Sequence, residues 1–267
     1  MTSYPDHAVL CDALLPLARK AGDAIMAIYA TPFVSRAKDD RSPVTDADDA
    51  AEEIILAGLQ QLTPGIPVVA EELAARGEAP AVGDAPFWLV DPLDGTREFI
   101  DRNGEFTVNI ALVERGQPVL GIVLAPALEI AWLGSAAGAR RFDRLHPDGK
   151  AIAARAVPAI APQVLVSRNH REPAVESWLQ QQLAPETRTV GSSLKFCQIA
   201  EGAADLYPRF ASISEWDTAA GQAVLEAAGG AVMVWDISAA QPRETGALRY
   251  GKSQFRNPAF LARGRIG

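Results

Sequence analysis

Carboxylate side chains follow the apolar run Phe87–Val90 in a pattern that could bind a metal ion. The run leads into the segment Asp91–Thr96, which reads DPLDGT. Pro92 and Gly95 favour a tight turn, and this turn would aim both aspartates and the Leu93 carbonyl at one point. Hard divalent cations such as Mg²⁺ prefer oxygen ligands of this kind. From these residues alone, the segment is either an oxygen-based metal site or an ordinary turn at the end of a strand.

Two further acidic positions could join the same site. Glu71 and Glu72 end a second apolar run, 67–70, and neighbouring strands of one sheet would bring the two run ends together. Asp217 opens a segment of small residues that closes at a Gly-Gly pair, which is typical of a helix C-terminus. Each position has a simpler explanation, because paired glutamates are common at solvated strand ends and an aspartate often caps a helix.

Three aspartates begin the second expected helix, 46–62. Asp46, Asp48 and Asp49 stand in its first turn, where negative charges complement the helix dipole. This structural role is sufficient for at least two of the three.

The elements expected in the first part of the chain are two helices and a mainly antiparallel sheet. Apolar residues at helical spacing predict helices over 7–30 and 46–62. Short apolar runs predict strands at 67–70 and 87–90, and an antiparallel meander follows across 106–143. The acids that could bind metal therefore lie at strand ends and helix starts.

The second part of the chain alternates between strands and helices. Strands are predicted at 164–167, 188–190, 205–207 and 231–235, and helices at 172–183, 194–201 and 216–228. We therefore expect an α/β (α+β) protein of two subdomains. The N-terminal α+β subdomain, 1–150, would carry most metal ligands, and the C-terminal α/β subdomain, 151–267, would carry Asp217 and substrate contacts.

The composition limits the classes of partner. The 267 residues carry 33 acidic and 25 basic side chains, a formal net charge of −8. A nucleic-acid coat or a basic membrane-surface protein would need an excess of Lys and Arg, so no nucleic-acid polymer is expected as partner. Two cysteines and three dispersed histidines favour neither a disulfide framework nor a zinc site. Without a transmembrane or signal-peptide pattern we expect a cytoplasmic protein, with peripheral contact at the inner membrane face left open.

The order and spacing of the four acidic segments resemble the inositol monophosphatase superfamily of metal-dependent, lithium-sensitive phosphatases. The shared motifs are the Glu-Glu strand end, the DPLDGT segment, and Trp-Asp before a small-residue helix that ends in Gly-Gly. Within the superfamily, the sequence is similar to the 3'(2'),5'-bisphosphate nucleotidases of the CysQ type. That similarity rests on Leu89–Leu112, Gly191–Cys197 and Ala204–Phe210. The resemblance implies a layered α/β/α/β/α sandwich with a catalytic cleft between its two subdomains.

The resemblance also implies roles for individual residues. Two or three Mg²⁺ ions would be bound by Glu71, Asp91, the Leu93 carbonyl, Asp94 and Asp217. Thr96 with Asp48 would orient and deprotonate the attacking water, which leaves Asp46 and Asp49 as helix-start or solvent charges. The substrate would contact Glu71, Leu93, Asp94, Gly95, Thr96, His170, Ser192, Lys195, Arg209 and Asp217.

The segment before Trp216 bears on the substrate. Inositol monophosphatases carry a glutamate there that binds sugar hydroxyls, whereas this sequence reads YPRFASIS and places Arg209 in the segment. A cation suits a second phosphate better than a neutral polyol. The resemblance thus implies a Mg²⁺-dependent phosphatase that converts the small nucleotide adenosine 3',5'-bisphosphate to AMP and phosphate, with 3'-phosphoadenylyl sulfate as a related substrate.

Several alternatives stay open at this point. The protein could be an inositol or broader sugar-phosphate phosphatase of the same superfamily, or a metal-stabilised binding module without catalysis. Lys195 and Arg209 could be ordinary surface cations, and Ser192 could be the N-cap of the helix at 194–201. His170 matches a family histidine only loosely. The oligomeric state is not readable from the sequence.

Overall fold

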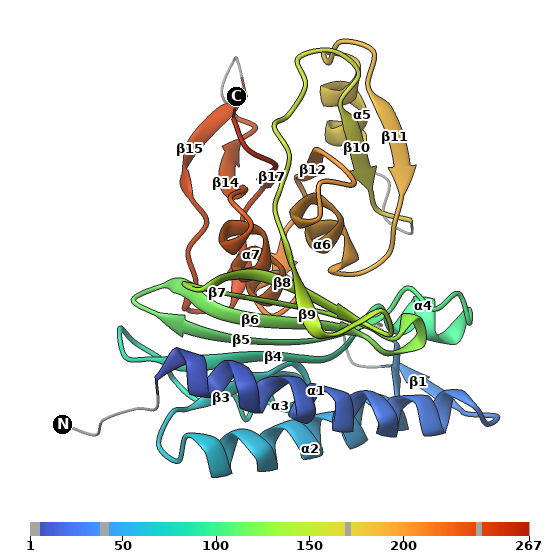
Figure 1. Cartoon of the computed structure of the whole chain (residues 1–267), viewed down its shortest axis with the longest axis vertical. Helices are drawn as coiled ribbons and strands as arrows, with labels where there is room; N and C mark the ends of the chain where they lie inside the picture. Colours follow the sequence, from blue (N-terminus) through green and yellow to red (C-terminus); the bar gives the residue numbers. More distant parts are fainter. Residues whose placement is uncertain (1–5, 38–42, 169–171, 239–241, 267) are drawn as a thin grey trace.

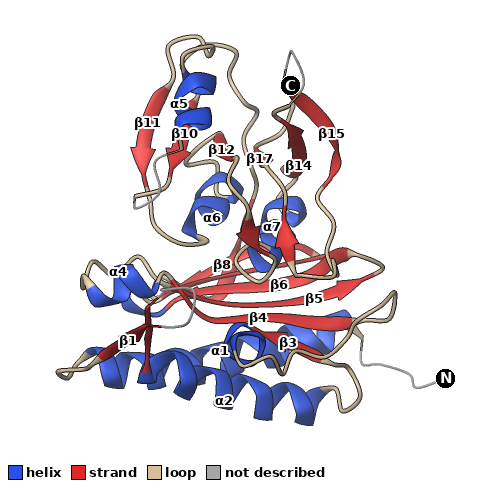
Figure 2. Cartoon of the chain, turned by 180° about the vertical axis from the view of Figure 1, so that it is seen from behind, coloured by secondary structure: helices blue, strands red, loops and turns tan. Residues whose placement is uncertain are grey.

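The protein folds into five alternating layers of helices and sheets, as seen in a computed structural model (Figure 1). The structure describes residues 6–37, 43–168, 172–238 and 242–266. Helices α1 (His7–Tyr29) and α2 (Asp46–Leu62) cover one face of a seven-stranded sheet. Helices α6 (Leu194–Ala200) and α7 (Ala219–Ala227) cover its other face and separate it from a six-stranded sheet. Helix α5 (Pro173–Leu179) forms the outermost layer, and the reverse view shows the same order (Figure 2).

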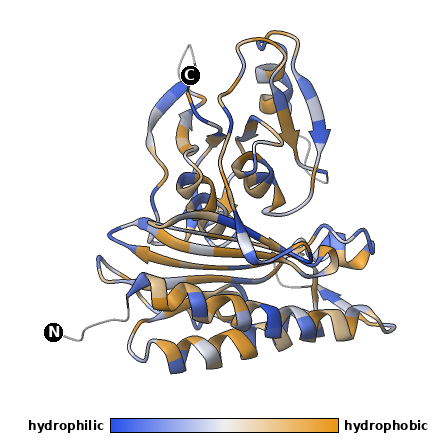
Figure 3. Cartoon of the chain, in the orientation of Figure 1, coloured by the Kyte–Doolittle hydropathy of each residue, from blue (hydrophilic) through white to orange (hydrophobic). Residues whose placement is uncertain are grey.

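The seven-stranded sheet has the order β3-β4-β5-β6-β7-β8-β9. Its strands are β3 (Val68–Ala70), β4 (Phe87–Asp94), β5 (Thr107–Glu114), β6 (Gln117–Ala125), β7 (Ile130–Ser135), β8 (Gly138–Asp143) and β9 (His146–Ile152). Strand β3 is parallel to β4, and the remaining neighbours are antiparallel. In β4, Trp88 and Val90 pack towards α1 and α2, while Phe87 and Leu89 pack towards α6 and α7. Both faces are therefore buried, and Figure 3 shows the hydrophobic character of these inner strands.

The six-stranded sheet has the order β11-β10-β12-β17-β14-β15. Its strands are β10 (Gln163–Val166), β11 (Glu186–Thr189), β12 (Leu206–Arg209), β14 (Ala231–Asp236), β15 (Arg243–Ala247) and β17 (Phe260–Arg263). Two short antiparallel pairs join β1 (Ser35–Ala37) to β2 (Pro43–Thr45) and β13 (Ile213–Ser214) to β16 (Arg256–Asn257). The remaining helical turns are α3 (Glu71–Ala75), α4 (Thr96–Ile100) and η1 (Pro126–Leu128). No helix among the described residues is long and apolar enough to cross a membrane.

Two glycines allow α7 to lie directly on the seven-stranded sheet. A Cβ at Gly121 of β6 would lie 2.7 Å from the Ala220 carbonyl oxygen, and one at Gly134 of β7 would lie 2.5 Å from Val224 Cα. Real Cβ atoms do not approach other atoms so closely, so any larger residue would push the helix away. This close packing fixes the N-terminal end of α7, and with it the nearby Asp217.

The layered α/β fold expected from the family resemblance is confirmed, and several element boundaries are corrected. Helix α5 is shorter than the predicted 172–183, since it ends at Leu179. The helix predicted to begin at residue 216 begins at Ala219. The chain leaves the first sheet at Ile152 and enters the second at Gln163. The division into subdomains 1–150 and 151–267 stays a prediction that accords with this change of sheet.

Candidate active site

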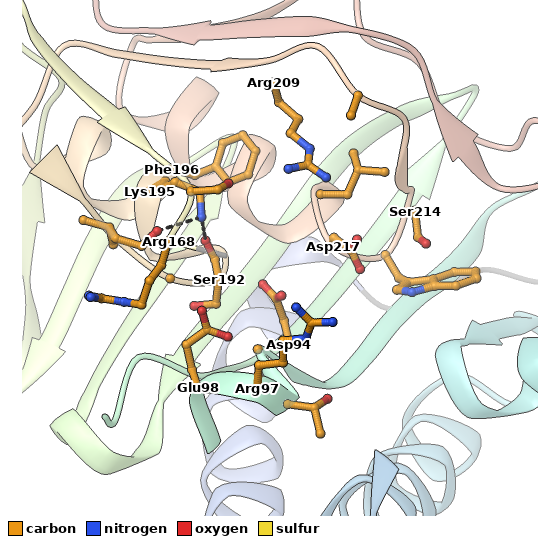
Figure 4. A pocket seen from close by; sticks show the side chains of 18 of the residues that line it. Asp94, Arg97, Glu98, Arg168, Ser192, Lys195, Phe196, Arg209, Ser214 and Asp217 are labelled. Carbon is orange, nitrogen blue, oxygen red and sulfur yellow. Dashed lines mark hydrogen bonds between the residues drawn. The ribbon is translucent and has the colours of Figure 1, made fainter. Parts of the chain in front are cut away.

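A cavity of about 540 Å³ lies where the two halves of the fold meet (Figure 4). Eight of the ten predicted substrate-binding residues line it: Glu71, Asp94, Gly95, Thr96, Ser192, Lys195, Arg209 and Asp217. The Leu93 side chain is buried beneath the turn, and His170 falls outside the described residues. Three exposed arginines that the sequence did not single out also line the cavity, namely Arg97, Arg168 and Arg256. The cavity is therefore lined by both carboxylate and cationic side chains.

Three carboxylates from different elements converge beside this cavity, and two of them, Glu71 and Asp217, line it. Glu71, Asp91 and Asp217 each offer an oxygen, and the three oxygens lie within 4.8 Å of one another. Glu71 follows β3 and Asp91 lies in the neighbouring β4, whose parallel pairing sets Ala70 beside Val90. The prediction that the two strand ends meet is therefore confirmed, and Asp217 reaches the cluster from the turn before α7.

Burial and mutual repulsion make this cluster unfavourable unless a cation is bound. Burial raises the pKa of Asp91 well above its usual range, and the charges of Glu71, Asp94 and Asp217 add to the effect. The pKa of Asp217 is likewise raised, first by burial and then by Asp94 and Glu71. A divalent cation would neutralise the repulsion and accept the oxygens as ligands, so the donor set fits a hard metal ion.

The turn after β4 presents its groups to the cavity because of two local features. Asp91 Oδ1 accepts a hydrogen bond from the Leu93 main-chain N–H at 3.0 Å, which bends the chain at the end of the strand. Gly95 has φ 95°, in the left-handed region, and a Cβ there would lie 3.2 Å from the Glu105 carbonyl oxygen. Glycine is therefore the residue that this turn accepts. It places Thr96 at the start of α4.

Thr96 and Asp48 are in contact although 48 residues separate them. Thr96 Oγ1 donates to Asp48 Oδ1 at 3.3 Å, and the Leu93 carbonyl oxygen lies 3.4 Å from the same hydroxyl. Asp48 Oδ2 accepts from both the N–H and the Oγ1 of Thr45, each at 2.8 Å, in the capping box of α2. Asp48 is 1% exposed. The capping box thus fixes a buried carboxylate, whose other oxygen faces the Thr96 hydroxyl.

The two other aspartates of this helix start bind elsewhere. Asp46 and Asp49 form ion pairs with Arg36, at 3.0 and 2.9 Å. This agrees with their expected role as surface charges at the helix start.

Asp94 is held by two polar residues that the sequence interpretation missed. Asp94 Oδ2 accepts hydrogen bonds from Ser193 N at 2.6 Å and from Ser193 Oγ at 2.5 Å. Ser193 Oγ in turn accepts from Asn109 Nδ2 at 2.6 Å. These contacts hold the Asp94 carboxylate in one orientation, with Oδ2 directed towards Ser193 at the start of α6. Only the pairing of distant segments reveals them, since neither a serine nor an asparagine in an apolar strand is distinctive in sequence.

Replacing Ser193 with alanine is expected to weaken Mg²⁺ binding by about tenfold, since groups that orient a metal ligand typically contribute that much. The measurement is calorimetric titration of the protein with Mg²⁺. Ser192→Ala is the matched control for metal affinity, because the Ser192 hydroxyl has no hydrogen-bond partner within the described structure. Equal Mg²⁺ affinities for wild type and Ser193→Ala would contradict the orienting role of Ser193.

Lys195 and Ser192 both line the cavity. Lys195 is 4% exposed, and its Nζ donates to the carbonyl oxygens of Val190 at 3.2 Å and Ser192 at 2.6 Å. Burial lowers the pKa of Lys195 to about 8, although nearby Asp94 and Glu98 act in the opposite direction. The alternative of a surface cation is therefore wrong for Lys195. Ser192 is not the helix cap either, because Ser193 holds that position.

Arg209, at the end of β12, points its guanidinium into the cavity (Figure 4). The residue is 8% exposed, so it too is not a surface cation. Its Nη1 pairs with Glu172 Oε1 at 2.9 Å, and its buried Nε has no partner among the described residues. Glu172 was not among the predicted site residues, since it lies 37 positions away from Arg209 and belongs to no motif.

The turn that carries Asp217 is held from both sides. The N-cap of α7 is Thr218, which corrects the alternative that Asp217 caps this helix. Thr218 Oγ1 accepts from Asn257 Nδ2 at 2.7 Å. On the other side, the buried Glu215 accepts from the Gly251 main-chain N–H at 2.7 Å. Asp217 thus sits between two anchored residues and faces the carboxylate cluster.

Comparison with known proteins identifies the family. A family model described as the inositol monophosphatase family matches residues 6–256. The chain belongs to the inositol monophosphatase family. Enzymes of this family depend on metal ions, which agrees with the convergent carboxylates of Glu71, Asp91 and Asp217.

Curated members of the inositol monophosphatase family resemble the chain over most of its length. The 3'(2'),5'-bisphosphate nucleotidase CysQ of Salmonella typhimurium is 47% identical over 255 residues, covering 94% of this chain and 98% of the relative. That of Escherichia coli strain K12 is 45% identical with the same coverage. Among solved structures, CysQ from Bacteroides thetaiotaomicron has a TM-score of 0.77 and 34% identity, covering 97% of this chain and 98% of that one. An inositol monophosphatase from Anabaena shares the fold, with a TM-score of 0.75 and 24% identity, covering 98% of this chain and 92% of that one.

Proposed function

We propose that the protein is a Mg²⁺-dependent phosphatase that hydrolyses the 3'-phosphate of adenosine 3',5'-bisphosphate to give AMP and phosphate. 3'-Phosphoadenylyl sulfate is proposed as a related substrate. The observation that carries the proposal is the buried Arg209 guanidinium in the same cavity as the Glu71, Asp91 and Asp217 cluster. The identity to the curated bisphosphate nucleotidases supports the same substrate class.

The metal would be held by Glu71, Asp91, the Leu93 carbonyl, Asp94 and Asp217, and we propose two to three Mg²⁺ ions. When bound, the ions supply Lewis-acid polarisation of the phosphoryl oxygens and activation of water, which the slow hydrolysis of a phosphate monoester requires. The choice of Mg²⁺ rests on the all-oxygen donor set.

Thr96 and Asp48 would supply the proton acceptor for the attacking water. Thr96 Oγ1 donates its proton to Asp48 Oδ1, so its lone pairs are available towards the cavity. The hydroxyl can accept a proton from the water while its own proton passes to Asp48. Direct in-line attack then forms the new bond between the water oxygen and phosphorus and breaks the bond from phosphorus to the 3'-oxygen. The 3'-oxygen leaves as an alkoxide and takes a proton from solvent water to give AMP, and no phosphoenzyme is needed.

Lys195 and Arg209 would bind the anionic parts of the substrate. The Arg209 guanidinium is buried, where a charge-assisted hydrogen bond to phosphate is strong. Lys195 lies 5.0 Å above the Tyr207 ring and faces the same space. A substrate with two phosphates can therefore meet metal ions with one and Arg209 with the other.

The proposal is tested by measuring phosphate release with Mg²⁺ from adenosine 3',5'-bisphosphate, inositol 1-phosphate and fructose 1,6-bisphosphate side by side. We expect a clear preference for the nucleotide. A preference for inositol 1-phosphate or fructose 1,6-bisphosphate would replace the proposal with a polyol or sugar phosphatase. Release from none of the three would favour a metal-stabilised binding module.

Arg209→Ala is expected to raise KM for adenosine 3',5'-bisphosphate by roughly 10- to 100-fold, the usual effect of losing a charged hydrogen bond. KM for 3'-AMP, which lacks the second phosphate, should change much less. Steady-state kinetics on the two nucleotides measure the difference. An equal rise for both would refute Arg209 as a ligand of the second phosphate.

We also propose a cytoplasmic location. The two cysteines, Cys11 and Cys197, are both free, as suits a reducing compartment.

A further inference from the structure

Glu172 makes one ion pair and two hydrogen bonds around the end of β12, although it lies in a different part of the sequence. It directly precedes α5, and its side chain is 12% exposed. Oε1 pairs with Arg209 Nη1 at 2.9 Å. Oε2 accepts from the main-chain N–H groups of Phe210 at 2.8 Å and Ala211 at 2.5 Å. One carboxylate thus binds both the Arg209 side chain and the backbone that follows it.

This arrangement leaves one particular edge of the Arg209 guanidinium for a ligand. Because Glu172 occupies Nη1, the unused donors are Nε and Nη2, which together form the lateral fork of the group. Nε is buried and has no partner within the described residues. A buried donor without a partner is costly. Two parallel N–H groups match the geometry of a phosphate, which would relieve that cost.

The pairing also explains how an arginine can stay buried in the cavity wall. A buried guanidinium without a counter-charge is strongly destabilising, and Glu172 supplies that charge from outside the cavity. Glu172 does not line the cavity itself, so it would act through Arg209 and not on the substrate.

We propose that Glu172 is a positioning residue that orients Arg209 for the phosphate that is not hydrolysed, and so sets the preference for doubly phosphorylated substrates. This inference rests on the proposed function, because it takes Arg209 as the ligand of that second phosphate. Glu172 would thus affect substrate specificity without contacting the substrate, through its ion pair with Arg209.

The test compares Glu172→Gln, Arg209→Ala and the double variant on adenosine 3',5'-bisphosphate and on 3'-AMP. Glutamine keeps one oxygen for the main-chain N–H groups and removes the ion pair with Arg209. We expect Glu172→Gln to raise KM for the bisphosphate by roughly tenfold and to leave KM and kcat for 3'-AMP within about twofold. The double variant should be no worse than Arg209→Ala, since the two residues act as a unit.

A second readout separates positioning from general structural support. Binding of AMP, which carries only the second phosphate, is measured by calorimetry for each variant, and thermal unfolding is followed in parallel. The lost ion pair is expected to lower the melting temperature of Glu172→Gln. Weaker AMP binding by this variant, measured at a temperature where thermal unfolding shows it fully folded, supports the proposal. Equal loss on both nucleotide substrates, or an additive double variant, would overturn it.

The experiment distinguishes failure of the proposed substrate preference from failure of the proposed role of Glu172. If the wild-type protein does not distinguish adenosine 3',5'-bisphosphate from 3'-AMP, the proposed function is wrong in its substrate. If the wild type distinguishes them and Arg209→Ala abolishes the difference but Glu172→Gln does not, only the role of Glu172 is wrong.

Discussion

Replacing Thr96 with valine is expected to lower kcat by roughly two to four orders of magnitude, the usual contribution of a positioned proton acceptor. Valine keeps the shape of threonine but removes the hydroxyl that contacts Asp48 Oδ1 at 3.3 Å. The water would then lose its route for proton transfer to a buried carboxylate. Steady-state phosphate release with saturating Mg²⁺ measures the effect.

Two controls make the Thr96 result specific. Thr96→Ser restores the hydroxyl and should recover most of the wild-type kcat. Calorimetric titration should show that the valine variant still binds Mg²⁺ with near wild-type affinity, because the Thr96 side chain is not among the converging carboxylates. If the valine variant releases phosphate at a near-normal rate, Thr96 and Asp48 are not the proton acceptor.

The residues found from the sequence share one property, which is that their type and spacing form a local pattern. The DPLDGT turn and the Glu-Glu strand end stand beside apolar runs, and the structure brings Glu71 and Asp91 together because β3 and β4 are parallel neighbours. The partner of Thr96 was also found, because Asp48 matched a known motif. In each case a short segment already contained the signal.

The site residues that were not predicted from the sequence contact partners that lie far away along the chain. Ser193 holds Asp94 across 99 positions, and Glu172 holds Arg209 across 37. Serine and glutamate are common residue types, and neither of these two positions was assigned a role from the sequence, so only the folded chain reveals the contacts. The family resemblance implied a substrate contact for Ser192, whereas no role was predicted for the adjacent Ser193.

Two of the strands that the sequence did not predict, β9 and β15, were missed for a different reason. Strand β15 lies at the edge of its sheet, and β9 lies at the edge of the other. Both consist mainly of exposed or half-buried residues, so neither shows the apolar run or alternation that marks an inner strand. Edge strands can be polar because one side of their backbone faces no neighbouring strand, and sequence patterns therefore underestimate the width of both sheets.

Replacing Asp91 with asparagine is expected to make the metal-free protein more stable near neutral pH while abolishing its stabilisation by Mg²⁺. Burial and three neighbouring carboxylates raise the pKa of Asp91 well above its usual range, so its ionised form opposes folding. Asparagine removes that charge and keeps the oxygen that accepts from the Leu93 N–H. For a chain of this size, each kcal/mol recovered raises the melting temperature by about 2–4 °C.

The stability difference between Asp91→Asn and wild type should depend on pH, and the direction of this dependence can be measured. Because the folded-state pKa of Asp91 is raised, its stabilising contribution is complete below the unfolded value of about 3.9 and is lost as the pH rises through the folded value. In EDTA, the advantage of Asp91→Asn over wild type should therefore be largest at neutral pH and disappear as the pH falls towards about 4. Thermal unfolding in EDTA across this range measures it.

With saturating Mg²⁺, the wild-type protein should be more stable than Asp91→Asn, which is the reverse of the order expected in EDTA. An ion that binds only the folded state stabilises it by about 2.7 kcal/mol at 100 times its Kd, and the wild type alone retains all the oxygen ligands. Asp46→Asn is the matched control, because the Asp46 side chain is 79% exposed and lies outside the carboxylate cluster. An Asp91→Asn variant less stable than wild type in EDTA at neutral pH would show that the cluster is not under charge repulsion. The carboxylates would then have to be stabilised by hydrogen bonds within the protein, and the metal would not be needed to hold them together.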